Sequence, residues 1–233
     1  MTRRPTARLL LAALVLPLLA ATCGSGGLPT VPPLTPAPTA PPPTHPGPTY
    51  PPGCPTSQPA ALGADETRTV TIETDQGKIV ISIKGSTSPI ATGNFVALVS
   101  CGYYDGVVFH RLDPGFVIQT GDGEFGRVPM VIPDLVGSGG PPYTIQDEPV
   151  TGTYRRGIVA MAKKPSANSA NSQFFIVLSD QGAANLEARY QILGTVTTGM
   201  DVVDTIAALP NSGPPSNLAV NDIPMTKVTV STP

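Results

Sequence analysis

The sequence is poor in the residues on which metal enzymes and many hydrolases depend. It has no tryptophan, two histidines and three cysteines, so a protein-built zinc site would need nearly all of its histidines and cysteines to converge. We therefore expect no metal and no other cofactor. A serine hydrolase is not supported either, because no G-x-S-x-G segment occurs and His110 is the only histidine outside a proline-rich tract.

Charged residues are also scarce, and neither sign dominates. They make up 13% of the 233 residues, with 14 Lys and Arg against 16 Asp and Glu. Nucleic-acid phosphates are bound by clusters of basic side chains, so no nucleic-acid partner is expected. The length leaves room for one catalytic domain of about 150 residues together with its ends.

The first 22 residues have the order of an export signal. Three arginines precede an apolar run at 9–21, which is too short to span a bilayer, and small residues follow. The stretch from Ala20 to Cys23 resembles a bacterial lipobox, whose cysteine is acylated, and diacyl lipid holds a protein stably on a membrane. We expect export, with lipid on Cys23 at the outer face of the cell membrane. The alternative is plain secretion with Cys23 incidental.

Proline is concentrated in one tract. Fourteen of the 29 prolines lie between Pro29 and Pro59, and such a segment favours extended polyproline II over helix or sheet. We therefore expect three parts: an export signal at 1–22, the lipobox cysteine with a Pro/Thr-rich disordered stalk at 23–61, and a folded domain at 62–233.

After residue 61 the pattern changes to short runs rich in β-branched residues, separated by Gly, Asp and Asn. Such runs are typical of strands in a barrel or sandwich. Ser88 and Pro89 predict the start of a helix that Gly102 ends, and Thr198 predicts the start of a shorter one. The eight predicted strands lie at 69–73, 79–83, 107–111, 116–120, 158–161, 174–178, 192–196 and 227–230.

Two sequence features resemble parts of catalytic sites, but the residues around them do not support that interpretation. Gly121 to Gly126 matches the G-x-G-x-x-G fingerprint of dinucleotide sites, which needs a helix that starts at its glycines. Pro129 and Pro133 interrupt the segment that follows, so we reject this interpretation. Cys101 is no better supported as a nucleophile, because a thiol at the end of an apolar helix face is more often buried or paired.

Phe109 to Gln119 and Ser172 to Ile176 concentrate residues suited to a shallow apolar groove. The phrase from Phe109 to Asp122 resembles the F-H-R-x-x-P-x-F-x-x-Q-x-G-D signature of the cyclophilins, the peptidyl-prolyl cis/trans isomerases. Further segments that resemble this family follow in the same order, at Gly157–Ala162 with Asn168–Ile176 and at Gly194–Asp204. The resemblance covers about residues 67–231. It implies a mainly β fold, a closed eight-stranded antiparallel barrel capped by two α-helices.

The resemblance implies an enzyme that accelerates rotation about Xaa-Pro bonds. Such a rotation breaks no covalent bond and transfers no proton, so it needs neither a nucleophile nor a metal. A guanidinium aimed at the proline nitrogen or the adjacent prolyl carbonyl bonds the twisted amide better than the planar one. The expected catalytic residues are Arg111, Phe116 and Gln119, and the expected substrate-binding residues are Val117, Ala162, Gln173, Phe175, Leu186 and Tyr190.

In this arrangement the apolar side chains form a cup for the proline ring, while Gln119 and Gln173 bond the substrate backbone or hold Arg111 in place. The expected partners are proline-containing peptides and unfolded exported proteins, and the expected state is a monomer. The alternative is a catalytically weak peptide-binding or adhesive module, which would have no need of Arg111. The insertion at 123–138 could form a lip on the groove.

The remaining polar residues carry structural expectations. His110 is expected to be hydrogen-bonded inside the domain, and Lys163 to be a solvated turn charge. If Cys23 carries lipid, two cysteines remain in an exported chain, where free thiols are a liability. Cys54 and Cys101 then form a disulfide that pins the end of the stalk to the domain, or they stay as an exposed and a buried thiol.

Overall fold

The computed structural model describes residues 50–129 and 133–232, so the predicted export signal, Cys23 and most of the stalk lie outside the described residues. The described part contains eight strands that form one antiparallel sheet in the order β3-β4-β6-β5-β7-β2-β1-β8. The strands are β1 (Thr67–Thr74), β2 (Gly77–Lys84), β3 (Arg111–Asp113), β4 (Val117–Thr120), β5 (Ile158–Met161), β6 (Phe174–Val177), β7 (Ile192–Thr198) and β8 (Lys227–Ser231).

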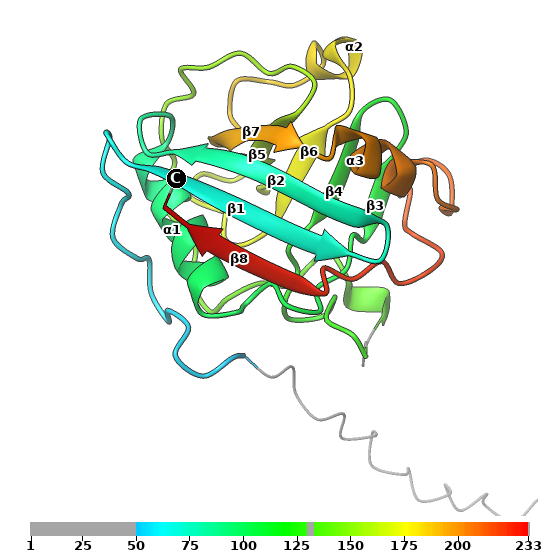
Figure 1. The fold of residues 1–233 in the computed structure, drawn as a ribbon, viewed down its shortest axis with the longest axis horizontal. Helices are drawn as coiled ribbons and strands as arrows, with labels where there is room; N and C mark the ends of the chain where they lie inside the picture. The colour runs from blue at the N-terminus through cyan, green and yellow to red at the C-terminus, as the bar shows by residue number, and fades with distance from the viewer. Residues whose placement is uncertain (1–49, 130–132, 233) are drawn as a thin grey trace, which may run out of the picture. The chain divides into compact units, whose positions relative to one another are not determined.

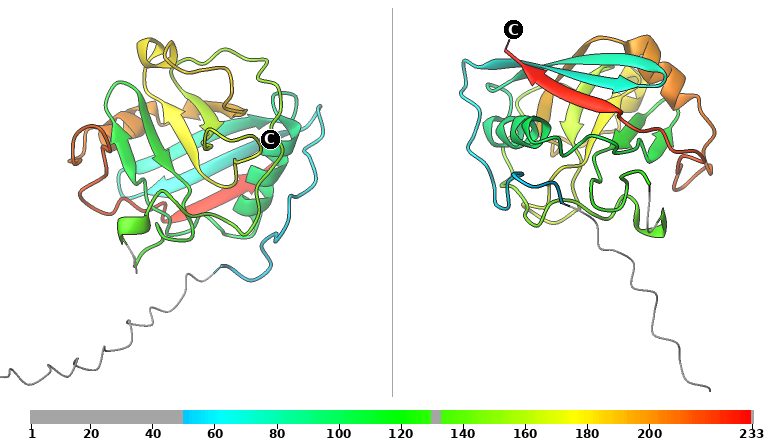
Figure 2. Two further views of the ribbon diagram at one scale, coloured as in Figure 1. Left: turned by 180° about the vertical axis from the view of Figure 1, so that it is seen from behind. Right: turned by 60° about the horizontal axis from the view of Figure 1, so that its bottom comes forward.

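The sheet curls into a half-barrel, with β8, β1 and β2 in front of β3, β4 and β6 (Figure 1). Its end strands are β3 and β8, which do not neighbour each other in the hydrogen-bonded order. The predicted mainly β, eight-stranded antiparallel fold is confirmed. The helices α1 (Pro89–Ser100) and α3 (Met200–Ala207) lie at opposite ends of the curled sheet (Figure 2), and a one-turn helix α2 (Asp180–Ala183) and a 3-10 turn (Pro133–Leu135) complete the elements.

Helix α1 starts at Pro89, as its sequence predicts, but its first turn is capped from far along the chain. The Ser88 side chain makes no cap hydrogen bond. The backbone N–H groups of Ile90 and Ala91 instead donate to the Glu148 carboxylate at 2.8 and 2.9 Å. A carboxylate satisfies two otherwise unpaired N–H groups here and lies at the positive end of the helix dipole.

One predicted strand is wrong. The run 107–111 contributes only Arg111 to β3, whereas Val107 and Val108 make single bridges with Arg127 and Pro224. The β-forming residues are therefore used, but their partners are loop segments that supply one or two hydrogen bonds rather than a ladder.

Alternate residues of the strands fill the interior of the half-barrel. Ile118 of β4 and Phe174 and Ile176 of β6 are fully buried there. Phe174 makes edge-on contacts with Phe95 of α1 and with Tyr104, at ring-centroid distances of 5.1 and 5.6 Å, an arrangement that aromatic pairs favour. This interior cluster anchors the strands whose other face carries the site.

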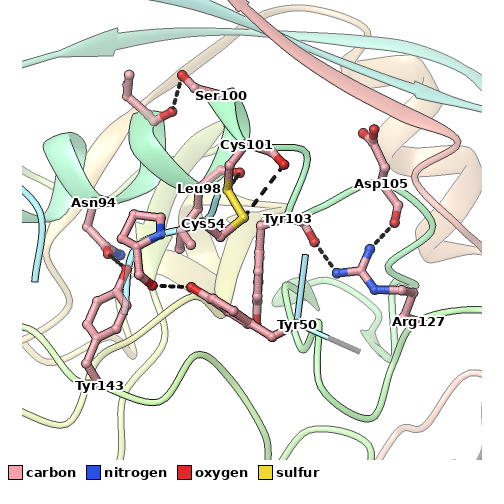
Figure 3. The surroundings of a disulfide bond; sticks show 12 residues. Tyr50, Cys54, Asn94, Leu98, Ser100, Cys101, Tyr103, Asp105, Arg127 and Tyr143 are labelled. Atoms are coloured by element: carbon pink, nitrogen blue, oxygen red, sulfur yellow. Dashed lines mark hydrogen bonds between the residues drawn. A yellow bond between two sulfur atoms is a disulfide. The ribbon is translucent and has the colours of Figure 1, made fainter. Parts of the chain in front are cut away.

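Residues 50–61, the last part of the predicted stalk, are described and lie against the domain. Cys54 is joined to Cys101, just after α1, by a disulfide with a Cα–Cα distance of 5.2 Å (Figure 3). The Tyr50 hydroxyl donates to the Pro55 carbonyl, and the Tyr50 ring lies 5.7 Å from that of Tyr103. A covalent bond and an aromatic contact thus hold the last residues of the predicted stalk against the domain.

Candidate active site

The site lies on the outer face of the half-barrel, where one row of paired residues crosses four strands. Arg111 of β3 pairs with Gln119 of β4, Gln119 with Phe175 of β6, and Phe175 with Ala160 of β5. Directly paired residues point to the same face of a sheet. Because their chain neighbours fill the interior, the side chains of this row point outward.

The structure gathers the predicted residues around a groove on this face. All of them except Gln173 line it, and Gln173 lines an adjoining pocket that also contains Gln119 and Ala162. Lys163 lines both hollows and was not predicted at the site. The groove is lined by Arg111, Phe116, Val117, Gln119, Ala162, Lys163, Phe175, Leu186 and Tyr190.

The apolar side of the groove is built on a second hydrophobic cluster, separate from the interior. Its buried members include Val117 and Phe175, and Phe116, Leu186 and Tyr190 pack against it. The Phe175 and Tyr190 rings meet edge-on at a centroid distance of 5.4 Å. Hydrogen bonds in both directions with the Tyr154 hydroxyl hold the Tyr190 backbone in place. The apolar surface is therefore supported from behind.

Arg111 is held by a neighbour that the sequence analysis missed. Its guanidinium donates to the Asp113 carboxylate at 2.5 Å and lies 5.8 Å from the centre of the Phe116 ring. The expectation that Gln119 or Gln173 holds Arg111 is not met, because Gln119 donates to the Gln173 side-chain oxygen at 2.9 Å. Strand alternation could have revealed Asp113, since residues two apart on a strand share a face.

Asp122, at the end of the first motif, organises the insertion that follows it. Its buried carboxylate accepts hydrogen bonds from the backbone N–H groups of Glu124, Phe125, Gly137 and Gly139. A buried carboxylate needs such partners, because leaving it unpaired would be costly. The aspartate thereby ties both ends of the insertion to the rim of the site.

The tied end of the insertion supports the second glutamine. The Gln173 side-chain amide donates to the Gly137 and Gly139 carbonyls at 3.1 and 2.9 Å, while its oxygen accepts from Gln119. Gly137 and Gly139 also line the pocket next to the groove. The insertion therefore does contribute to the rim, through its last residues.

His110 differs from its expected state. The side chain is buried, and neither ring nitrogen makes a hydrogen bond of standard geometry with the described residues, although the Val108 backbone lies close enough to raise the pKa of the imidazole. Burial lowers the pKa of His110 to about 4, an effect that the nearby charge of Asp122 opposes and that of Arg111 adds to. The imidazole is therefore neutral near pH 7. It lies directly before Arg111 in the chain, but it does not line the groove.

Lys163 is not the solvated charge that its position in a turn suggested. Its side chain is only 6% exposed and pairs with Asp147 at 2.5 Å. Burial raises the pKa of Asp147, but hydrogen bonds from Lys163 and from the Asn168 backbone lower it by more, so that it falls below its ordinary value. This pair fixes the loop that borders the groove beside Ala162.

No helix in the described part of the chain combines the length and hydrophobicity of a membrane span. Within residues 50–129 and 133–232, no three His, Cys, Asp or Glu side chains gather as metal ligands would. The groove itself presents the Arg111 guanidinium, the Gln119 amide and a supported apolar surface.

Known proteins are similar to this chain in both sequence and fold. Residues 69–231 match the family described as cyclophilin type peptidyl-prolyl cis-trans isomerase/CLD. A probable peptidyl-prolyl cis-trans isomerase of Brucella abortus is 38% identical over 148 residues, which span 63% of this chain and 74% of the relative. A peptidyl-prolyl cis-trans isomerase of Acinetobacter baylyi is 35% identical over 147 residues, which span 61% of this chain and 73% of the relative.

Among solved structures, a cyclophilin type peptidyl-prolyl cis-trans isomerase of Cryptosporidium parvum has a TM-score of 0.60 at 30% identity and covers 72% of this chain and 99% of its own. A second structure of that protein, in the presence of the dipeptide Ala-Pro, matches with the same TM-score at 29% identity and covers 71% of this chain and 99% of its own. The sequence match spans most of the described domain, and the fold agrees with it. The chain therefore belongs to the cyclophilin-type peptidyl-prolyl cis-trans isomerases.

Proposed function

We propose that this isomerase stabilises the twisted Xaa-Pro amide through Arg111 while the apolar side of the groove holds the proline ring. The barrier to rotation is about 18–20 kcal/mol, because the planar amide is stabilised by conjugation. In the twisted state the proline nitrogen has lost that conjugation and becomes a hydrogen-bond acceptor. A guanidinium directed at this nitrogen, or at the adjacent prolyl carbonyl, therefore bonds the transition state better than the ground state.

The contacts of Arg111 support this role. Asp113 and the Phe116 ring hold the guanidinium beside the apolar wall, and the side chain remains 29% exposed toward the groove. An arginine held in place loses less entropy when it bonds the substrate. One charge-assisted hydrogen bond contributes about 1.5–3 kcal/mol, which corresponds to about one to two powers of ten in rate.

The apolar cup provides the rest of the proposed catalysis. Phe116, Phe175, Leu186 and Tyr190 surround a site in which a proline ring is fixed while the preceding carbonyl rotates. The same surroundings disfavour the planar amide, which is the more dipolar state. Gln119, held by Gln173, presents its remaining N–H and its side-chain oxygen to the peptide backbone.

A proline-containing peptide is the proposed ligand of this groove. The relative whose structure was determined in the presence of Ala-Pro supports this choice. A catalytically weak peptide-binding module would use the same cup but would gain nothing from a held arginine. The single observation that favours catalysis is therefore the outward, ion-paired Arg111 beside the Phe116 ring.

The test is the Arg111→Ala variant in a protease-coupled or NMR-exchange assay on an Xaa-Pro peptide. We expect kcat/KM to fall by about one to two powers of ten with the fold intact, because the lost hydrogen bond acts mainly in the transition state. Arg111→Lys should rescue it poorly, since a point charge lacks the planar fork. Arg155→Ala, which removes an exposed arginine outside the groove, is the control. Full activity in a folded Arg111→Ala variant would refute the assignment.

We further propose that the protein acts on exported proteins at the outer face of the cell membrane, as a lipid-anchored monomer. The sequence of residues 1–23 supports export and acylation, and the Cys54–Cys101 disulfide suits an oxidising compartment. Cys23→Ser should release the protein from the membrane fraction into the medium without changing its isomerase activity. Retention of the variant in the membrane fraction would contradict the lipid anchor.

A further inference from the structure

Large apolar side chains are rarely exposed in the described part of the chain, and one of them, Leu218, lies beside the site. Leu135, Leu218 and Val220 are 41%, 42% and 63% exposed, and they are the large exposed apolar residues of the described ranges. Leu135 lies in the 3-10 turn of the insertion. Leu218 belongs to a segment that bridges to Arg111 at the outer edge of β3. Single exposed apolar residues are common on proteins, so their placement carries the argument.

Leu218 continues the row of site residues by one position. It forms an antiparallel bridge with Arg111, flanked by hydrogen bonds from Leu112 N–H to the Asn217 carbonyl and from Ala219 N–H to the His110 carbonyl. Paired residues point to the same face of a sheet, with Cβ atoms about 4.5–5.5 Å apart. Ala219, the next residue, packs against the interior cluster. The Leu218 side chain therefore points outward, next to Arg111 and on the side away from Gln119.

The segment holds Leu218 in this exposed position. The Leu218 N–H donates to the Ser212 hydroxyl at 3.0 Å, and its carbonyl accepts from the Ser212 N–H at 2.8 Å. Asn217, buried and with a φ of +50°, turns the chain directly before it. The exposed leucine is thus presented by a fixed loop, and binding to it costs little conformational entropy of the backbone.

The two flanks of the groove differ in chemistry. Beyond Gln119 the adjoining pocket is polar and is lined by Lys163, Lys164 and Asn171, among others. Beyond Arg111, on the other side, lies Leu218. When Arg111 bonds the prolyl carbonyl, one of the two acceptors that the proposed function names, the residues that follow the proline pass over Arg111 toward Leu218.

We propose that Leu218 forms an apolar subsite that binds a hydrophobic side chain one or two residues after the substrate proline. This inference rests on the proposed function, because the position of Arg111 relative to the prolyl carbonyl sets the direction of the peptide. It names a substrate class: Xaa-Pro segments followed by apolar residues, as occur in unfolded chains that expose their future core.

The test compares two peptides that are identical except after the proline, where one has two leucines and the other two serines. The parent protein should isomerise the leucine peptide with a kcat/KM about fivefold higher, mainly through KM, because partial burial of one apolar side chain provides a factor of this size. Leu218→Ser should remove this preference and leave the rate on the serine peptide unchanged. Leu135→Ser, at the same exposure, is the matched control and should keep it.

The outcomes separate this inference from the catalytic assignment. Arg111→Ala should slow both peptides by the same factor, whereas Leu218→Ser should affect only the leucine peptide. Equal rates of the parent on both peptides, or a preference that survives Leu218→Ser, would overturn the subsite. A folded Arg111→Ala variant of full activity would instead count against the catalytic role of Arg111. A change of the Leu218 methyl NMR signals that only the leucine peptide produces would support the subsite independently of turnover.

Discussion

The two faces of the sheet formed by β4, β5 and β6 carry different tasks, although their residues alternate along the same strands. Ile118, Phe174 and Ile176 point inward and belong to the large interior cluster. Val117, Phe175 and Val177 point outward and belong to the smaller cluster under the groove. Phe174 is fully buried and Phe175 is 4% exposed, so burial alone hardly distinguishes these neighbours.

The difference lies in what each face borders. An inward side chain is enclosed by other elements, including α1 and its aromatic Phe95. An outward side chain borders a groove that is open to a ligand. Inward substitutions should therefore lower stability and leave the chemistry of folded molecules intact, whereas outward substitutions should lower activity with less effect on stability. The following predictions test this contrast.

The largest difference in stability and activity is expected between two variants, Phe174→Ala on the inward face and Phe175→Ala on the outward face. The first should lower the free energy of unfolding by about 3–5 kcal/mol, because it leaves an enclosed cavity. The second should lower it by less, since the space opens toward the groove, but should reduce kcat/KM at least about tenfold by removing one wall of the cup. Urea unfolding and isomerase assays on both variants measure the two quantities. A similar loss of activity per folded molecule in both would contradict the division between faces.

The disulfide should also act on stability alone. Cys54 and Cys101 are 47 residues apart, and closing such a loop stabilises by about 4 kcal/mol in the chain-entropy model. The double variant Cys54→Ser with Cys101→Ser should unfold at lower urea concentration, with kcat/KM of the folded protein unchanged. The parent protein after reduction of this disulfide should behave likewise. Unchanged stability would show that the 50–61 segment contributes nothing to the domain.

The buried imidazole of His110 should make the free energy of unfolding depend on pH. Its folded-state pKa of about 4 lies below its ordinary value of 6.5, so the folded protein keeps it neutral while the unfolded chain gains a proton. Stability from this group is therefore fully present above about pH 6.5 and is lost as the pH falls toward 4, by about 3 kcal/mol in total. Urea unfolding at pH 7 and pH 5 should show a smaller decrease for His110→Gln than for the parent. Equal decreases would be inconsistent with a buried neutral imidazole.

The smallest loss of stability is expected for a substitution at the rim of the apolar cup. Leu186 is half-buried and packs against the outer cluster from the segment after α2. Leu186→Ala should cost less than about 1 kcal/mol of unfolding free energy, while KM for an Xaa-Pro peptide rises severalfold because part of the apolar surface is lost. Steady-state kinetics with matched urea curves measure both. Unchanged kinetics would remove Leu186 from the binding surface.

Local patterns predicted much of this fold. The strand 158–161 is predicted with the bounds that β5 has, and Pro89 and Gly102 bracket α1 as their backbone preferences suggest. The run 107–111 was misassigned because β propensity indicates extended backbone and does not reveal whether a ladder partner is available. Its actual partners, Arg127 and Pro224, come from loops that carry no periodic signal.

By itself, the sequence determined which residues could form the site, because its motifs place Arg111, Val117 and Gln119 at alternating positions that share one face of the strands, with Phe116 in the turn between them. Only the tertiary structure decided what surrounds them. The support of Arg111 by Asp113, the four N–H groups on Asp122, the bond between Cys54 and Cys101 and the position of Leu218 beside Arg111 all depend on it. Periodicity is a property of neighbouring residues, whereas these contacts depend on register and loop paths that the packing of the whole chain selects.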